Sequence, residues 1–424
     1  MSRRFWVETL GCPKNQVDSD KLTGTMLADG LVPAVSPDDA DLVVVNTCAF
    51  IEEARQESID AILDLSDRRA VGAELVVTGC LAERYGDELA EALPEADAVV
   101  GFGVPVTLGP ARSSQAEARG GAVPSLDLLE LPRPPAAAPW AYVKVAEGCD
   151  RKCGFCAIPS FRGVQRSRTV DSVLTEVDGL AASGVREVVL VAQDLAAYGR
   201  DQGRGERRIV PLLGEVARRV RRVRLLYLYP SDLTDGLIDA ICATGVPYFD
   251  LSLQHASGPL LRRMRRWGDG PRFERRIAAI RAREPDAAFR SSFIVGYPGE
   301  TESDHDALLA FVDGAGLDWA GFFAYSPEPG TYAAGLAGAV PAGLVADRLA
   351  ELRELQDGIT AVARDALIGQ VLEVMVDAPG VARSHREAPE IDGIVAVPDH
   401  VRPGEVVKVQ ITGAAGPDLD GTLV

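Results

Sequence analysis

The segment EGCDRKCGFCAIP carries three cysteines whose spacing suits iron–sulfur chemistry. Cys149, Cys153 and Cys156 are arranged as C-x3-C-x2-C in a loop that follows the apolar run YVKVA. Three thiolates on one short loop can hold three irons of a 4Fe–4S cube and leave the fourth iron without a protein ligand. Zinc is the main alternative, but a structural zinc site needs four closed ligands, and no fourth ligand follows nearby in the sequence. The spacing therefore favours a cluster with one open iron.

Three further cysteines stand at the ends of apolar runs that have the composition of buried strands. The runs FWVETLGC, VVVNTC and LVVTGC end on Cys12, Cys48 and Cys80. Three separate, inert core thiols are the simplest alternative, because free cysteine is commonly buried. In a parallel sheet, however, ligand sites gather at the carboxyl ends of the strands. The sequence places all three cysteines at such ends.

Length and composition limit the class of protein. A chain of 424 residues exceeds one ordinary core, so we expect two to four domains. Basic residues at the start, MSRRFW, are followed by no apolar stretch of a secretory signal, and no apolar run approaches the about 20 residues of a membrane span. We therefore expect a cytoplasmic protein, in which the seven cysteines are metal ligands, catalytic thiols or core residues rather than structural disulfides.

The charge balance restricts the partners. The chain has 62 acidic and 44 basic residues and a net charge of −18. An acidic chain is poorly suited to a broad nucleic-acid footprint, which needs basic surface. The balance favours a basic macromolecular partner, although a local basic patch is compatible with it.

The elements that position the first three cysteines form an α/β pattern over residues 1–105. Apolar runs (FWVETL, DLVVVN and ELVVTG) predict strands, and amphipathic runs (DSDKLTGTMLADG and EEARQESIDAILDLSDRRA) predict helices. Strand, helix and strand at this spacing predict a parallel sheet with right-handed crossovers. The segment 106–137 loses this periodicity and is rich in Pro, Gly, Ala and Ser, as expected of a linker.

The alternation of strands and helices resumes over residues 138–365. Six candidate strands are AYVKVA, EVVLVA, VRLLYL, YFDLSL, RSSFIV and WAGFFAY. Six βα units predict an open, partial TIM-like barrel, because a closed barrel of eight units would need more chain. Residues 366–424 are rich in valine and turn residues and predict a small antiparallel β-barrel. From Leu367 onward this tail has nine acidic and four basic residues, a net charge of −5.

Together these segments resemble the methylthiotransferase family of radical S-adenosylmethionine (SAM) enzymes. The features that resemble the family are the C-x3-C-x-aromatic-C loop with Phe155, the three strand-end cysteines and the β-barrel tail. They occur in matching order over nearly the whole chain. The resemblance implies that the loop cysteines hold a 4Fe–4S cluster whose open iron binds SAM. It also implies a second 4Fe–4S cluster on Cys12, Cys48 and Cys80, and a tail that is a TRAM domain.

Within that family, the sequence resembles the branch that acts on ribosomal protein uS12. The similar segments are LGCPKNQVDSD, GCDRKCGFCAIPSFRG and VAQDLAAYG. The reaction that this implies replaces a C–H bond on the β-carbon of a uS12 aspartate by a methylthio group, with SAM as methyl donor and as radical source. The alternative substrate is transfer RNA, as in the other branch. A third possibility is an iron–sulfur scaffold that binds ribosomes without chemistry, against which the complete cysteine loop argues.

The resemblance also suggests further cofactor contacts. Gly296, Pro298, Gly299 and Glu300 lie in IVGYPGETESDHD, which resembles the family segment beside the SAM adenosine, although an ordinary turn with a capping box is an equal alternative. Around the second barrel strand we expect Glu187, Gln193 and Asp194 near the SAM amino group, and after the cysteine loop Arg166 or Arg168 near its carboxylate. Gln254 and His255 end a strand at the catalytic face of such barrels, where a structural histidine is as plausible as a catalytic one.

The resemblance implies several partners. These are uS12, free or within the small ribosomal subunit, an electron donor such as flavodoxin or ferredoxin, and a sulfur donor. An acidic tail should attract a basic ribosomal protein and repel an RNA backbone, so nucleic acid is not expected as the direct substrate.

Overall fold

The computed structural model describes residues 2–106, 127–203 and 207–424. These residues form two compact units. Unit 1 comprises Met1–Pro135, Lys144–Asp150 and Ala157–Arg168, and unit 2 comprises Ala136–Val143, Arg151–Cys156 and Thr169–Val424. Most of the predicted linker, residues 106–137, lies outside the described residues, so the linker and the domain boundaries drawn from it stay predictions.

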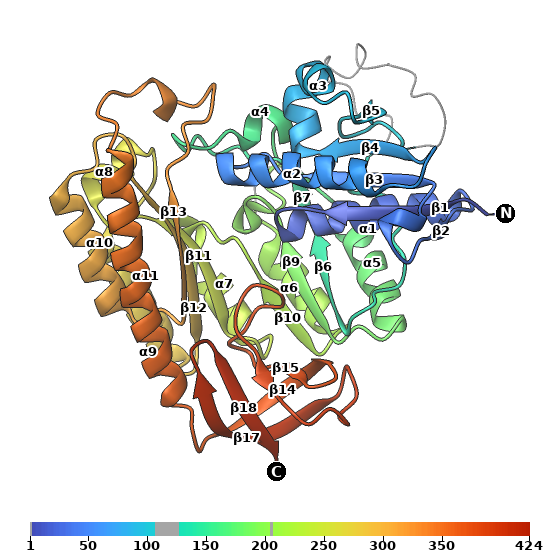
Figure 1. Cartoon of the computed structure of the whole chain (residues 1–424). Coiled ribbons are helices and arrows are strands. Elements are labelled where there is room, and N and C mark those ends of the chain that lie inside the picture. Colours follow the sequence, from blue (N-terminus) through green and yellow to red (C-terminus); the bar gives the residue numbers. More distant parts are fainter. Residues whose placement is uncertain (1, 107–126, 204–206) are drawn as a thin grey trace. The chain divides into compact units, whose positions relative to one another are not determined.

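A parallel sheet of five strands forms the centre of unit 1 (Figure 1). In spatial order the strands are β2 (Val32–Pro33), β1 (Arg4–Thr9), β3 (Leu42–Thr47), β4 (Glu74–Gly79) and β5 (Ala98–Val99). Successive residues of β3 belong to different cores, since Val43 and Val45 pack in one apolar cluster and Val44 in another. A strand that is buried on both faces must be apolar throughout, which explains its continuous run of valines.

Three helices begin where three of these strands end. They are α1 (Pro13–Ala28), α2 (Glu52–Arg68) and α3 (Cys80–Ala92). The strand ends are level with one another, because Thr9 is paired with Asn46 and Asn46 with Thr78. Unit 1 also contains a 3-10 turn η1 (Pro37–Asp39), the short helix α4 (Ile158–Arg162), and β7 (Ala146–Glu147) paired antiparallel with β8 (Arg166–Ser167).

Six strands form the open barrel that the sequence predicts. One three-stranded sheet has the order β10 (Arg222–Leu225), β9 (Glu187–Val191) and β6 (Trp140–Lys144), and the other has the order β11 (Tyr248–Gln254), β12 (Ala288–Val295) and β13 (Trp319–Ala324). A parallel bridge between Leu228 and Leu251 connects the two sheets. Parallel pairing within each sheet confirms the α/β fold class with a partial barrel.

Helices connect these strands, as expected of βα units (Figure 1). They are α5 (Val170–Ala182), α6 (Ile209–Ala217), α7 (Asp235–Cys242), α8 (Gly258–Arg263), α9 (Gly270–Arg283) and α10 (Glu302–Ala315), with 3-10 turns η2 (Leu195–Ala197) and η3 (Pro230–Asp232). The 3-10 turn η4 (Ala333–Gly335) and the helix α11 (Ala342–Asp365) follow the last barrel strand and lead to the tail. Among the described residues, no helix combines the length and the apolar character needed to cross a membrane.

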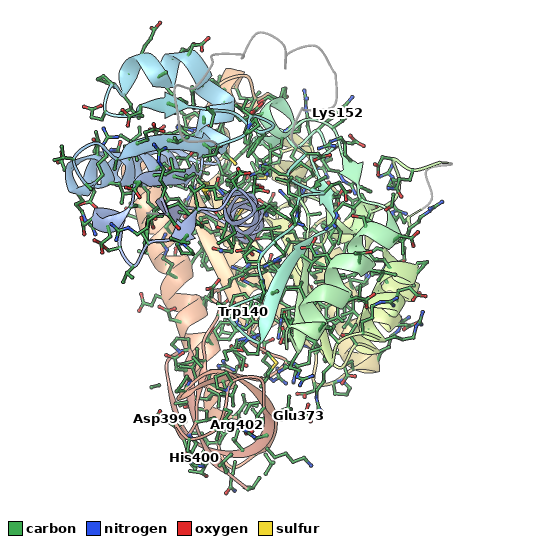
Figure 2. All side chains as sticks on the ribbon, turned by 90° about the vertical axis from the view of Figure 1, so that its right-hand side faces the viewer. Trp140, Lys152, Glu373, Asp399, His400 and Arg402 are labelled. Carbon is green, nitrogen blue, oxygen red and sulfur yellow. The ribbon has the colours of Figure 1, made fainter. Side chains whose placement is uncertain are left out.

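The tail is a closed barrel of five strands. In spatial order they are β14 (Val371–Ala378), β15 (Val381–Arg383), β16 (Val395–Ala396), β18 (Asp418–Leu423) and β17 (Val406–Ala415). The prediction of a small β-barrel is confirmed, with the difference that β16 and β18 pair in parallel. Figure 2 shows Glu373, Asp399, His400 and Arg402 around this barrel.

Two of the tail's acidic residues are not part of its surface. Glu387 is fully buried and forms an ion pair with Arg364 of α11 at 2.5 Å. The buried carboxylate of Asp392 accepts hydrogen bonds from the Tyr248 hydroxyl at 2.6 Å and from Arg290 at 3.3 Å. Buried charges must be paired to be tolerated, so these carboxylates join the tail to the barrel of unit 2. These two carboxylates, like the buried Arg383 of the tail, are therefore not part of the charge that the tail offers to a partner.

Candidate functional site

Three thiols gather at the carboxyl edge of the sheet in unit 1. Cys12 is the residue before α1, Cys48 follows β3 directly, and Cys80 is the first residue of α3. Cys48 and Cys80 are buried and Cys12 is partly buried, and none of them is in a disulfide. The thiols at a helix start also lie where unpaired N–H groups favour negative charge.

The thiols are close enough to influence one another, since Cys12 raises the pKa of both Cys48 and Cys80. Burial, together with the neighbouring Cys12 and Cys80, raises the pKa of Cys48 to about 12. Burial also raises the pKa of Cys80, although Arg162 opposes this effect. At Cys12 burial is outweighed by Lys14 and Arg162, which lower its pKa. Such a group of thiols suits a cationic metal group, which stabilises all three as thiolates.

The backbone around the thiols is held by hydrogen bonds and is closely packed. The Ser58 hydroxyl accepts a hydrogen bond from the Cys48 backbone N–H at 3.0 Å, and the Asn15 side-chain amide donates to the carbonyls of Leu10 and Thr47. A Cβ at Gly11 would lie 2.9 Å from the Cys48 sulfur. At Gly79, where φ is +94°, a Cβ would lie 2.5 Å from the Thr47 backbone nitrogen. Glycine is required at both positions because a side chain there would collide with these neighbouring atoms.

A buried arginine connects one of these thiols to a group of charged residues. The guanidinium of Arg162, at the end of α4, donates to the Cys80 sulfur at 3.0 Å and to the Asn15 side-chain oxygen at 2.7 Å. It also pairs with Asp18 at 3.1 Å and with Glu147 at 2.9 Å. Lys144 pairs with both carboxylates as well, at 2.6 Å from Glu147. Against the effect of burial, Arg162 and Lys144 hold the pKa of Glu147 well below its usual range.

Three cysteine thiols are donors that an iron–sulfur cube can use. Among the described residues, no three His, Cys, Asp or Glu side chains converge on one metal-ion position. The cysteines of a cube each bind a different iron, so they stand farther apart than the ligands of one ion. Two buried thiols and one partly buried thiol, with an arginine hydrogen bond to one sulfur, are donors of the kind that such clusters use.

The first cysteine of the C-x3-C-x2-C loop lies in unit 1. Cys149 is buried, and its backbone N–H donates to the Gly163 carbonyl at 3.1 Å. The preceding Gly148, where φ is +76°, packs so closely that a Cβ would lie 2.2 Å from the Val164 oxygen. Cys149 also lies two residues from Glu147, which the Arg162 guanidinium contacts. Within unit 1, therefore, Arg162 connects Cys80 with the strand that leads to Cys149.

The other two loop cysteines lie in unit 2. Cys153 accepts a hydrogen bond at its sulfur from Arg266 at 3.3 Å, and the backbone N–H of Cys156 donates to the Cys153 carbonyl at 3.3 Å. Arg151 in the same loop pairs with Asp194 at 2.6 Å and also with Asp232. Asp194 follows β9 and Asp232 follows β10, so Arg151 ties the loop to the carboxyl ends of two barrel strands.

Glu187 is the predicted site residue that the structure places elsewhere. It is the first residue of β9, at the amino end of the strand, and is fully buried. Its carboxylate contacts Arg224 at 2.8 Å, Arg222 at 3.5 Å and Arg383 of the tail at 3.4 Å. These arginines outweigh burial and hold the pKa of Glu187 well below its usual range. The structure thus places Glu187 at the joint between barrel and tail, at the end of β9 opposite to the carboxyl end.

The other predicted cofactor contacts lie on turns and loops. Glu300 accepts hydrogen bonds from the backbone N–H of Gly296 at 2.6 Å and of Tyr297 at 3.3 Å, and pairs with Arg348 at 2.8 Å. The capping box at Thr301 and Asp304 is present as well. Glu300 thus shapes the turn after β12, on which Gly296 and Pro298 lie. The predicted anion-binding residue Arg166 pairs in unit 1 with Asp127 at 2.7 Å.

The carboxyl end of β11 contains a strained residue. Gln254, the last residue of the strand, has φ of +73°, a conformation that side chains rarely adopt and that often marks functional sites. The next residue, His255, is fully buried, and its Nδ1 accepts a hydrogen bond from the Ser257 backbone N–H at 3.0 Å. Within the described part of the chain its Nε2 has no hydrogen-bond partner, and burial lowers its pKa to about 3.

Sequence reasoning missed the arginines that contact the cysteine sulfurs. Arg162 lies six residues after Cys156 in FRG, and Arg266 lies in the basic run RRMRRW, and such charge runs are usually solvated. Both are buried. A signal for Arg162 was its position close after the cysteine loop and directly before Gly163, but nothing in the sequence distinguishes Arg266 from its exposed neighbours.

Comparison with known proteins agrees with this architecture. Residues 4–101 match the Uncharacterized protein family UPF0004, residues 143–312 the Radical SAM superfamily, and residues 368–424 the TRAM domain. Among solved structures, the radical S-adenosylmethionine methyltransferase TsrM from Kitasatospora setae has a similar fold, with a TM-score of 0.52 at 18% identity over 94% of this chain and 83% of that chain. The fold and the matched segments define a radical SAM enzyme with a TRAM domain.

Curated relatives show which family of radical SAM enzymes the chain belongs to. The chain is 42% identical over its whole length to the ribosomal protein uS12 methylthiotransferase RimO of Anaeromyxobacter sp. (strain K), of which it covers 94%. It is 44% identical to the protein of the same name from Moorella thermoacetica, with 96% of each chain covered. The chain belongs to the RimO family of ribosomal protein uS12 methylthiotransferases.

Proposed function

We propose that this chain transfers a methylthio group to the β-carbon of an aspartate in ribosomal protein uS12, with two 4Fe–4S clusters and SAM. The substrate is proposed from the relatives, which are named for uS12. The proposal of two clusters rests on the three thiols at one sheet edge of unit 1, which are separate in sequence from the C-x3-C-x2-C loop. Two sets of three cysteines match two cubes that each keep one iron without a protein ligand.

The residues have distinct roles in this proposal. Cys149, Cys153 and Cys156 hold the cluster that binds SAM, and Cys12, Cys48 and Cys80 hold the cluster at which sulfur is delivered. When bound, SAM with its cluster supplies the radical that removes hydrogen from the substrate carbon, and a second SAM supplies the methyl group. Gln193, which follows β9, and the turn at Gly296 and Pro298 are the proposed SAM contacts, with Glu300 holding that turn in shape.

The chain's own groups orient the cysteines. Arg162 fixes the Cys80 sulfur through a hydrogen bond, and Arg266 does the same for Cys153. Hydrogen bonds to the sulfurs are one of the factors that set cluster potentials, so the two arginines are positioning residues. Arg166 reaches a SAM carboxylate in this proposal only by exchanging its present partner, Asp127.

The proposed partners follow from the reaction. The enzyme needs an electron donor of the flavodoxin or ferredoxin type, a sulfur donor and uS12, free or in the small ribosomal subunit. Since ribosomal subunits are assembled in the cytoplasm, the enzyme is proposed to act there.

Intact-mass analysis of uS12 tests the substrate. In cells that lack this gene we expect uS12 without the methylthio mass, and restoration of that mass by the wild-type gene. Methylthiolated transfer RNA with unmodified uS12 would instead support the other branch of the family.

Two triple variants test the cysteine roles. Full-length protein should bind about eight irons after anaerobic reconstitution, and each triple Cys→Ala variant about four. Replacing Cys12, Cys48 and Cys80 should leave 5′-deoxyadenosine formation intact and abolish methylthio transfer, whereas replacing the three loop cysteines should abolish both. Methylthiolated product from the first variant would remove the second cluster from the mechanism.

A further inference from the structure

A group of exposed arginines lies at the end of α8 in unit 2. The side chains of Arg262, Arg263 and Arg265, here called the arginine patch, are all exposed. Arg263 donates a hydrogen bond to the Ala337 carbonyl at 3.1 Å. No ion pair joins any of the three to a carboxylate in the part of the chain that the structure describes. Other exposed arginines among the described residues also lack such a partner, but these three lie together within four residues of the chain.

The sequence around the patch has few acidic residues, and the nearest one, Asp269, pairs with Arg272 at 3.3 Å. From Gly258 to Gly268 the sequence contains no Asp or Glu, and no charged residue occurs between Glu328 and Asp347. Part of this uncharged segment packs against the patch, as the hydrogen bond to Ala337 shows. The chain as a whole has a net charge of −18, so this positive surface stands out against a negative background.

The patch is in direct backbone contact with the cysteine loop. Gly154, next to Cys153, donates from its N–H to the Met264 carbonyl at 2.8 Å, and its own carbonyl accepts from the Ala333 N–H at 2.8 Å. Met264 lies within the patch sequence, and Arg266 just after it donates to the Cys153 sulfur. A Cβ on Gly154 would lie 3.1 Å from the Tyr332 ring, so the loop and the patch are closely packed.

Arg265 is held in a conformation that normally belongs to glycine. Its φ of +56° is that of the residue after a helix end, and α8 ends at Arg263 with Met264 as its cap. Glycine is usual at this position because a side chain is disfavoured there. The Arg265 guanidinium lies 3.6 Å from the centre of the Tyr332 ring, which is itself 43% exposed. The Tyr332 ring therefore orients the exposed charge of Arg265, whose backbone is strained.

We propose that the arginine patch is the docking surface for an acidic one-electron donor protein of the flavodoxin or ferredoxin type. This inference rests on the proposed function, because it requires a cluster at the loop of Cys149, Cys153 and Cys156. On docking, one electron leaves the reduced donor and enters that cluster, and the donor is oxidised by one electron. Electron transfer requires the donor to approach the cluster, and the patch is the positive surface that adjoins its loop.

The chemistry of the patch fits this partner. Complexes of redox proteins are small and depend on complementary charge, which speeds encounter and is screened by salt. An acidic donor would be repelled by most of a chain with a net charge of −18. The exposed Trp267 and Tyr332 add apolar contact area beside the arginines.

Other partners fit less well. A basic ribosomal protein would be repelled by unpaired arginines. RNA would be attracted to them, but it gains nothing from their contact with the cysteine loop, since phosphate binding needs charge alone. The position of the patch therefore favours the electron donor over RNA.

The test compares a protein reductant with a chemical one. In the double variant R262S/R265G, glycine suits the backbone at 265, so the fold should be kept. With the reconstituted full-length enzyme and reduced flavodoxin, we expect 5′-deoxyadenosine formation to fall about fivefold or more at low salt, and the difference to shrink as salt rises. With dithionite, which needs no docking surface, the rate should stay at the wild-type value. The control variant R402S/K408S removes the same charge from the tail and should behave as wild type in both assays.

A binding measurement provides a readout that does not depend on activity. The Kd of the iron-free full-length chain for flavodoxin should rise about fivefold or more in R262S/R265G and stay unchanged in R402S/K408S. An unchanged flavodoxin-driven rate, an equal loss with dithionite, or a loss of ribosomal RNA binding without a loss of flavodoxin binding would each overturn the inference. Failure of the proposed function is distinguishable, because wild-type enzyme would then form 5′-deoxyadenosine without methylthiolating uS12.

Discussion

Replacing Arg162 by methionine should destabilise unit 1 strongly. The guanidinium pairs with Asp18 at 3.1 Å and with Glu147 at 2.9 Å, and these side chains are 4%, 1% and 14% exposed, respectively. In the wild type, two cations (Arg162 and Lys144) balance two carboxylates; in the variant, Lys144 alone faces both. Removing one partner from a buried ion pair costs about 3–5 kcal/mol because a buried charge is left uncompensated. We expect a loss of that size in the free energy of unfolding.

A second variant separates the charge effect from lost packing. In R162M/E147Q the remaining pair, Lys144 and Asp18, is balanced again, so the double variant should be more stable than R162M even though it carries one more substitution. Amide hydrogen exchange of β3 and β4 in the iron-free protein reports the stability of unit 1 separately from that of unit 2. A loss below about 1 kcal/mol in R162M, as for an exposed ion pair, or a double variant less stable than the single one, would refute the reasoning.

Three further predictions concern individual positions. G79A should destabilise the protein more than G72A. Both glycines have positive φ, but only at Gly79 would a Cβ collide with the Thr47 backbone. Thermal unfolding compares the two variants, and an equal loss of stability in both would exclude the steric argument. E187Q should lower the free energy of unfolding by about 3–5 kcal/mol and leave SAM cleavage by the folded enzyme unchanged, whereas selective loss of cleavage would restore the predicted SAM contact. The pKa of His255 is lowered to about 3 in the folded protein, whereas in the unfolded chain a histidine has a pKa of about 6.5. Between about pH 6.5 and about pH 3 the proton therefore binds the unfolded chain and not the folded one, so the protein loses stability as the pH falls through this range. H255N should therefore reduce the fall in stability between about pH 6 and pH 4.5 in denaturant titrations, and an unchanged slope would show that the histidine is not responsible.

The sequence by itself determined the elements and the positions of the cysteines. The valine runs predict β3 and β4 because a strand buried on both faces has to be apolar throughout, and the structure confirms these strands. The strand-end cysteines meet at one edge because parallel strands that start level also end level, as the pairing of Asn46 with Thr78 shows. Local composition was sufficient here because each of these features depends on short-range periodicity.

The partners of individual charged side chains were decided only by the tertiary structure. Glu187 lies in a strand near the predicted site, but the direction of β9 places it at the opposite end, where Arg383, distant in sequence, reaches it. Glu387 counts as negative surface in the sequence and is buried against Arg364 in the fold. Arg162, Arg265 and Arg266 are alike as residue types, yet one contacts Cys80, one is exposed on Tyr332 and one contacts Cys153. Side-chain burial and long-range pairing depend on which elements pack together, and no local pattern in the sequence records that.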